Sequence, residues 1–203
     1  MPGKRSAEDA RRTRESIVAS ALALFADKGF DSTGVREIAD RAGVSHGVLR
    51  HHFGSKLDIW TSVADTAFAH YRGIMLPVVE AAASHDDPLA AFRSVVSAFI
   101  TTTLKTPEYA RLFVNETSQQ SERAEYCSVR FSAMHEAIGG LFLRARETSG
   151  ALQKHTNDSF FCALMSLTYF HLLHPHATTM PVFPLPGGTA DMHEFICSVL
   201  FGD

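Results

Sequence analysis

Cysteine is scarce in this chain, and its spacing argues against two kinds of site. The 203 residues include three cysteines, Cys127, Cys162 and Cys197. An odd number at such wide intervals gives neither a disulfide framework nor the closely spaced thiols of a structural zinc site. We therefore expect core thiols in a reducing compartment. The first residues also lack the apolar stretch of a secretory signal, so the expected location is the cytoplasm.

Familiar enzyme motifs and a membrane-spanning length of apolar sequence are also missing. There is no His-Glu-x-x-His sequence and no glycine-rich phosphate loop, so we expect neither an enzyme nor a bound cofactor. The most apolar stretch, 160–173, is shorter than the ~20 residues that cross a bilayer, which excludes a membrane partner. His171 and His174 have a helical metal-ligand spacing, but no carboxylate or thiol stands at a matching interval. We therefore expect no metal site.

Strand patterns are absent from the C-terminal part, and helix start signals take their place. No segment after residue 56 alternates apolar and polar residues as a strand does. Capping side chains or a proline at the first helical position predict helix starts at Asp87-Pro88, Thr106-Pro107, Ser121 and Asn157-Asp158. With further helices expected over 10–27, 55–75 and 192–200, the sequence predicts an all-α fold.

Residues 32–53 contain two short amphipathic helices separated by a brief turn. Spacing of i, i+3, i+4 and i+7 places four apolar residues on one face of the first helix: Val35, Ile38, Ala39 and Ala42. Gly43 suits a turn with positive φ, and Ser45 is a favourable N-cap for the second helix, which buries Leu49 and Phe53. This is the helix-turn-helix pattern, whose second helix normally enters the DNA major groove.

The surrounding residues narrow this pattern to a family. Ser55-Lys-Leu-Asp58 forms a capping box that opens the next helix. Roughly residues 10 to 60 resemble the DNA-binding domain of the TetR-type (AcrR-type) transcriptional regulators through Gly29-Phe30, Ile38-Ala39, Ala42-Gly-Val-Ser45, Gly47, Leu49, His52-Phe53 and Ser55-Lys56-Leu57. The resemblance implies a homodimeric repressor that binds a pseudo-palindromic double-stranded operator and is released by a small-molecule effector.

Charge is divided unequally along the chain. Residues 1–56 hold ten Lys/Arg against seven Asp/Glu, or +3, whereas the remainder holds nine against fifteen, or −6. A basic N-terminal part fits a phosphate partner. Arg11, Arg12 and Arg14 would stand in the first turns of a helix starting near Ala10, where cations oppose the helix dipole and suggest DNA phosphate as a partner. Residues 1–10 are expected to be disordered.

The outward face of the second short helix provides most of the candidate DNA contacts. Arg50 can bond bidentately to guanine or contact phosphate, and Val48 can contact a thymine methyl. The family usually has a tyrosine at the position of Arg50, so its role stays open between base and phosphate. The candidate DNA-binding residues are Thr33, Ser45, His46, Gly47, Val48, Arg50, His51 and Lys56.

The C-terminal part is expected to hold an effector pocket. The helix from Ser55 to about Met75 joins it to the N-terminal part, and Pro77 should bend or end that helix. A small apolar or aromatic ligand is expected, with candidate contacts from Phe68, Tyr71, Met75, Phe99, Tyr109, Phe113, Glu116, Met134 and His135. The alternative is that these side chains simply fill the core.

The segment Phe160–Leu173 is apolar on all sides, which in a small domain suggests that one side meets a partner subunit. A second apolar stripe in Met192–Leu200 could pair with it. The candidate dimer contacts are Phe161, Met165, Tyr169, Phe170, Phe195 and Val199. The intervening 175–188 is expected to be a stiff loop, since it holds four of the eight prolines.

These patterns predict two domains. Residues 1–56 form an N-terminal arm and a three-helix helix-turn-helix head, and residues 57–203 form an all-helical body for ligand binding and dimerisation. Two alternatives stay open at this point. The body could serve only to dimerise a DNA-binding protein without a ligand, or the chain could be an enzyme with a DNA-binding head.

Overall fold

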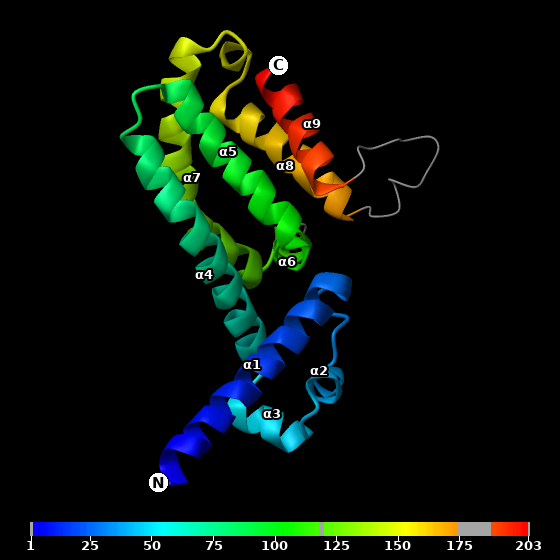
Figure 1. Ribbon diagram of the computed structural model, residues 1–203. Helices are drawn as coiled ribbons and strands as arrows, with labels where there is room; N and C mark the ends of the chain where they lie inside the picture. Colours follow the sequence, from blue (N-terminus) through cyan, green and yellow to red (C-terminus); the bar gives the residue numbers. More distant parts are fainter. Residues whose placement is uncertain (1, 118–119, 174–187, 203) are drawn as a thin grey trace.

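The computed structural model describes residues 2–117, 120–173 and 188–202, and within these ranges the chain is helical and contains no strand. The predicted all-α class is confirmed. Figure 1 shows α1, α2 and α3 gathered at one end of the molecule, which we call the head, and α5 to α9 at the other end, which we call the body. The long helix α4 connects the two.

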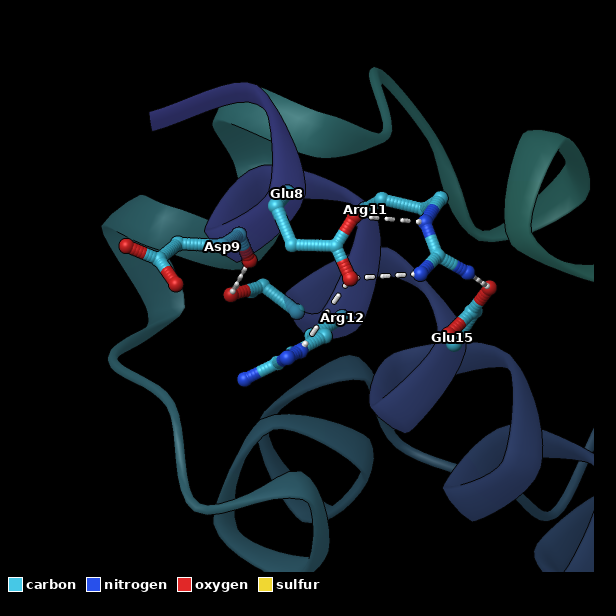
Figure 2. A network of polar contacts seen from close by, with 6 residues as sticks. Glu8, Asp9, Arg11, Arg12 and Glu15 are labelled. Atoms are coloured by element: carbon cyan, nitrogen blue, oxygen red, sulfur yellow. Dashed lines mark hydrogen bonds and ion pairs between the residues drawn. The ribbon is translucent and has the colours of Figure 1, made fainter. Parts of the chain in front are cut away.

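The first helix, α1, spans Pro2–Lys28 and begins earlier than expected. The prediction of a disordered segment over residues 1–10 is therefore wrong for the residues from Pro2 onward. Figure 2 shows the ion pairs that join successive turns here: Arg11 binds Glu8 and Glu15, each at 2.6 Å. Such i,i+3 and i,i+4 pairs favour helix. Because α1 starts at Pro2, Arg11 stands in its third turn and not its first. The helix dipole acts mainly on charges in the first turn, so it does not indicate a phosphate partner for Arg11.

Two short helices complete the head: α2 (Val35–Ala42) and α3 (His46–His52). Their inner faces pack on α1 and on the first turns of α4 around buried apolar side chains, among them Ile17, Phe25, Ile38, Leu49 and Trp60. The expected positions of the turn and of both helices are confirmed.

Helix α4 spans Lys56–Ala83 and continues through Pro77. The expectation that the helix ends near Met75 is wrong. Proline removes one helical hydrogen bond and crowds the preceding turn, which costs about 3 kcal/mol. The residues beyond it bury Val79 and Ala82 in the body core, and this burial offsets the local cost. The resulting 28-residue helix is about 42 Å long at ~1.5 Å per residue.

The body consists of α5 (Pro88–Lys105), α6 (Pro107–Thr117), α7 (Glu122–Thr148), a 3-10 helix (Leu152–Lys154), α8 (Asn157–Leu173) and α9 (Thr189–Phe201). Asp87 and Ser121 cap α5 and α7 as predicted. The cap expected at Asn157-Asp158 lies one residue earlier. Thr156 and Ser159 each accept a hydrogen bond from the other's backbone N–H, at 3.1 and 2.9 Å.

Aromatic rings packed at tilted and edge-on angles fill the centre of the body core. The rings of Phe92, Phe142 and Phe160 lie 5.1–5.6 Å apart, centroid to centroid. Cys127 is buried in the same apolar cluster as the core residues of the head, whereas Cys162 is exposed. The expectation of three core thiols is therefore wrong for Cys162, which stands on the outer side of α8.

The core of the head continues into the body. Leu112 and Phe113 of α6 and Cys127 of α7 belong to the same buried cluster as the head residues. The division of the chain at residue 56 into two functional domains stays a prediction. Within the described ranges, no helix has both the length and the apolar character needed to span a membrane. The stiff loop expected at 175–188 lies, apart from its last residue, outside the described residues.

Candidate nucleic-acid interface and helical body

The turn between α2 and α3 depends on one glycine. Gly43 has φ of +69°, the left-handed region that side chains other than glycine rarely adopt. Its N–H bonds back to the carbonyl groups of Ala39 and Asp40. Ala39 is 1% exposed, and its small side chain lets α3 cross α2 closely. The chain reverses here within three residues, 43–45.

Ser45 fixes the start of α3 by capping it. Its Oγ accepts a hydrogen bond from the backbone N–H of Val48 at 3.2 Å. Residues 43–47 also match Gly-x-Ser-x-Gly, the pattern around the nucleophile of many hydrolases. That role requires a strand before the serine, whereas here α2 precedes it. The hydroxyl of Ser45 is a helix cap.

The two faces of α3 lie as the sequence predicts. Leu49 is buried at 1% exposure, and Phe53 just beyond the helix is buried at 3%. The opposite face is exposed over five residues: His46, Gly47, Val48, Arg50 and His51. This face carries two imidazoles, one guanidinium and one apolar side chain, which are groups that can contact base edges and phosphates.

Arg14 anchors the end of α3 to α1. Its guanidinium donates to the carbonyl oxygen of His52 at 3.1 Å and to Ser62 Oγ at 2.8 Å. The same group lies 4.2 Å from the centre of the Phe53 ring. The sequence suggested that this arginine faces DNA, but in the structure it is bound within the head. Thirty-eight residues separate Arg14 from His52, and no local pattern signals such a contact.

Two candidate DNA-binding residues, Thr33 and Lys56, lie outside the exposed face of α3 and make contacts within the protein. Thr33 is 2% exposed and donates its hydroxyl to the carbonyl oxygen of Gly29 at 2.7 Å. Lys56 lies with Nζ 4.3 Å from the centre of the Phe30 ring. Desolvation lowers the pKa of Lys56; the carboxylate of Asp31 opposes this effect and the charge of Arg123 adds to it. The DNA-binding roles of Thr33 and Lys56 stay predictions.

The expected effector-pocket residues are divided between two packed clusters. Phe68, Phe113 and Phe131 pack ring against ring with centroids 4.7–4.9 Å apart. Met75, Phe99 and Met134 instead pack in or against the body core. The rings of Tyr109 and His70 pack at a tilt with centroids 5.0 Å apart, and the ring of exposed His135 lies 4.6 Å from that of Phe161, centroid to centroid. These contacts favour the alternative reading in which such side chains fill the core.

Glu116 is a structural group and not a free polar contact for a ligand. It is 3% exposed and accepts hydrogen bonds from Trp60 Nε1 at 3.1 Å and from Arg123 Nε at 2.7 Å. Arg123 also stacks on Phe30 of the head, with its guanidinium carbon 3.9 Å from the ring centre. Glu116 therefore joins α4, α6 and α7 where the head meets the body.

A groove of about 670 Å³ runs between α4 and α5. Its walls combine apolar, hydroxyl and basic side chains: His70, Ile74, Val78, Ser94, Ser97, Ala98, Thr101, Thr102, Lys105 and Thr106. None of the effector contacts predicted from sequence lines it. The one signal in the sequence that could have indicated it is the repeat of serine and threonine along residues 94–106.

The candidate dimer contacts lie partly inside the chain and partly on its surface. Phe161 is 7% exposed and fills the core, and Met165 and Tyr169 are half-buried. Burial raises the pKa of Tyr169 far above its ordinary value. Phe170, Phe195 and Val199 are 49%, 37% and 52% exposed. Since α8 and α9 lie side by side (Figure 1), these three residues lie on neighbouring helices.

Metal-binding geometry is absent from the part of the chain that the structure describes, where no three His, Cys, Asp or Glu side chains gather. His174 and the side chain of His171 lie outside that part. His193 has another contact: its Nε2 lies 2.8 Å from Ser97 Oγ and links α9 to α5.

A helix-turn-helix head with an exposed second helix, carried on an all-helical body, is an arrangement typical of DNA-binding regulators. A family model described as "Bacterial regulatory proteins, tetR family" matches residues 17–63. Residues 17–63 therefore form a DNA-binding domain of the TetR type.

Characterised relatives and solved structures agree with this assignment. The transcriptional activator FasR of Mycolicibacterium smegmatis is 32% identical over 143 residues, which cover 70% of this chain and 63% of FasR. The transcriptional repressor BepR of Brucella suis is 32% identical over 61% of this chain and 56% of BepR. The alignments thus span somewhat over half the length of these relatives. The structure of AibR with isovaleryl coenzyme A and operator DNA shares the fold, with a TM-score of 0.73 and 14% identity over 93% of this chain and 98% of AibR.

Proposed function

We propose that the chain is a repressor that acts as a homodimer: it occupies a pseudo-palindromic operator and is released by a small molecule bound to the body. Residues 1–56 would bind DNA, and residues 57–203 would dimerise and sense the ligand. The observation that carries the proposal is the solvent-exposed face of α3, with Val48, Arg50 and His51 directed away from the buried Leu49. Its place of action is the cytoplasm, where the chromosome is accessible.

The exposed apolar side chains of α8 and α9 support the dimer. Phe170 and Leu173 at the end of α8 are 49% and 42% exposed, and Val199 of α9 is 52% exposed. Large apolar side chains grouped in this way mark a protein-protein contact. Pairing the two helices with their copies in a second chain would bury this surface around a two-fold axis.

A two-fold axis fixes the form of the DNA site. The two α3 helices would enter successive major grooves on one face of the duplex, which requires a separation of about 34–36 Å between them. The operator would then be a pseudo-palindrome whose half-sites repeat after one helical turn. Any ligand that changes this separation lowers the affinity for DNA.

Coupling between a ligand in the body and the DNA-binding head is supported by the geometry of α4, and a related structure shows that this fold can hold both a ligand and DNA. Helix α4 runs from the end of the head into the body (Figure 1), so a displacement in the body reaches the head through one continuous helix. AibR has been captured with both isovaleryl coenzyme A and operator DNA. BepR is described as a repressor and FasR as an activator, so the sign of regulation needs its own measurement. We propose no catalytic activity.

The test has two parts. Immobilised protein should retain a small set of genomic fragments that share an inverted repeat, and an Arg50→Ala, His51→Ala double variant should not enrich them. Adding the protein to in vitro transcription from such a fragment should then lower transcript yield. If no fragment is enriched over the double variant, the DNA-binding proposal fails. If transcript yield rises, the chain is an activator.

A further inference from the structure

The groove between α4 and α5 has one polar and one apolar end. The helices are joined by the short segment 84–87 and run antiparallel (Figure 1), so positions along them can be paired. Val78 lies at the level of Ser94, and Ile74 at the level of Ala98. His70 lies at the level of Thr101 and Lys105, at the end nearer the head. The basic groups therefore stand at one end of the groove, and the aliphatic side chains at the other.

The polar end holds a buried nitrogen that lacks a partner. His70 Nε2 is buried and makes no hydrogen bond. Tyr109 holds the ring in place, with centroids 5.0 Å apart. A buried polar atom is normally satisfied by the protein, by water or by a bound group, and His70 is one of the residues that line the groove. Lys105 is exposed on the same wall and takes part in no ion pair among the described side chains. Together they provide a site for an oxygen anion.

Three of the five hydroxyl groups that line the groove already make hydrogen bonds within the chain. The hydroxyl of Ser94 donates to the carbonyl oxygen of Ala91 at 2.7 Å, and that of Thr106 donates to Thr102 O at 2.8 Å. Ser97 Oγ is engaged with His193 Nε2 at 2.8 Å. Hydroxyls that are already satisfied present mainly their carbon atoms, so this wall suits a hydrocarbon better than a sugar. Ile74, at 38% exposure, adds apolar surface that no part of the described chain covers fully.

We propose that this groove binds a small amphipathic carboxylic acid, with the carboxylate at Lys105 and His70 and the hydrocarbon chain along Ile74 and Val78. The volume of about 670 Å³ lies in the range of small-molecule sites. This inference rests on the proposed function, because the bound acid would be the effector. The ligand would separate α4 from α5 next to Tyr71, whose hydroxyl donates to Thr103 Oγ1 at 3.3 Å across the two helices.

Sodium decanoate is the probe, and isothermal titration of the purified full-length chain is the measurement. We expect one decanoate per chain in the groove and at least tenfold weaker binding of decan-1-ol, which keeps the hydrocarbon and lacks the charge. Lys105→Gln should raise the Kd for decanoate at least tenfold, which corresponds to about 1.4 kcal/mol. Ile74→Trp should fill the apolar end of the groove and raise the Kd for decanoate to a similar extent. The matched control Lys154→Gln removes an exposed lysine elsewhere and should leave the Kd unchanged.

Several outcomes would overturn the inference: no decanoate binding, equal binding of decan-1-ol, or unchanged affinity in both groove variants with native circular dichroism. Retention of genomic fragments by the same variants separates this inference from the proposed function. If fragments are retained and decanoate neither binds nor releases them, the groove assignment fails and DNA binding stands. If decanoate binds with the expected variant pattern and no fragment is retained, the groove assignment stands as a ligand site and the regulatory function fails.

Discussion

The indole N–H of Trp60 donates a hydrogen bond to the carboxylate of Glu116 over 3.1 Å, inside the junction of head and body. The same carboxylate accepts from Arg123, whose guanidinium covers Phe30 of the head. One buried carboxylate thus holds α4, α6 and α7 in register beneath the DNA-binding head. Changes at this site should act on the stability of the junction as a whole.

Removing that carboxylate should destabilise the fold. Glu116→Ala leaves the Trp60 N–H and the Arg123 guanidinium without their acceptor, and losing buried hydrogen bonds to a charged group costs about 2–3 kcal/mol. Urea unfolding measures the change. Glu136→Ala is the control, because Glu136 is exposed on α7 and should shift the free energy of unfolding by less than about 0.5 kcal/mol. Equal effects of the two variants would show that the buried network contributes no stability.

A side chain at position 43 should destabilise the turn of the helix-turn-helix. At φ of +69°, Gly43→Ala places a Cβ in the left-handed region, which costs about 1–2 kcal/mol. No atom lies within 4 Å of the added Cβ, so the loss comes from backbone strain alone. Gly140→Ala is the matched control: it also meets nothing within 4 Å but lies inside α7, and it should stabilise by about 0.5–1 kcal/mol. Thermal unfolding should show a lower Tm than the parent for Gly43→Ala and a higher Tm for Gly140→Ala.

Arg50 should contribute to sequence reading. A bidentate contact to guanine is worth about 1–3 kcal/mol of discrimination, so Arg50→Ala should relax base preference at one position of a selected binding site. Arg36→Ala is the control: it removes an exposed guanidinium from α2, outside α3, and should leave the base preference unchanged. Binding-site selection with each variant measures the preference. An unchanged preference in the Arg50 variant would assign that side chain to phosphate instead.

The exposed apolar face of α8 and α9 should be needed for dimers. Phe170→Glu or Val199→Glu would place an unpaired charge in a dry interface, which costs several kcal/mol. Light scattering should then report half the parent mass, and operator binding should be lost. Val129→Glu is the control, since Val129 is 66% exposed on α7, away from this face. Dimers that persist in both α8 and α9 variants would place the interface elsewhere.

Stability should fall in alkaline solution, partly through Cys127. Burial raises the pKa of this thiol to about 12 from an ordinary value of 9.0. The fold thus favours the neutral thiol, and this contribution is complete below pH 9 and is lost as pH rises toward 12. Urea unfolding at pH 8 and pH 10 measures the loss. Cys127→Ala should reduce the difference in the free energy of unfolding between pH 8 and pH 10. Cys162→Ala changes an exposed site and should leave that difference as it is in the parent.

Signals that act over a few residues made the head predictable from sequence. Gly43 needs no neighbour to favour positive φ, Ser45 caps a helix only three residues away, and the spacing of Ile38 and Ala39 defines a buried face by itself. The same holds for the caps at Asp87 and Ser121. These features depend on local backbone geometry, so reading the chain in order was sufficient to find them.

Other features were decided only by contacts between distant segments. Arg14 meets the end of α3 across 38 residues, and Trp60 meets Glu116 across 56. Helix α4 continues through Pro77 because the residues beyond it are buried against the body. The groove beside His70 exists because two antiparallel helices leave space between their side chains. The sequence by itself determined the all-helical class, the caps at Asp87 and Ser121 and the DNA-binding motif. The tertiary structure decided which charges are buried, which aromatic rings are core and where a ligand could enter, because these depend on which faces of distant helices meet.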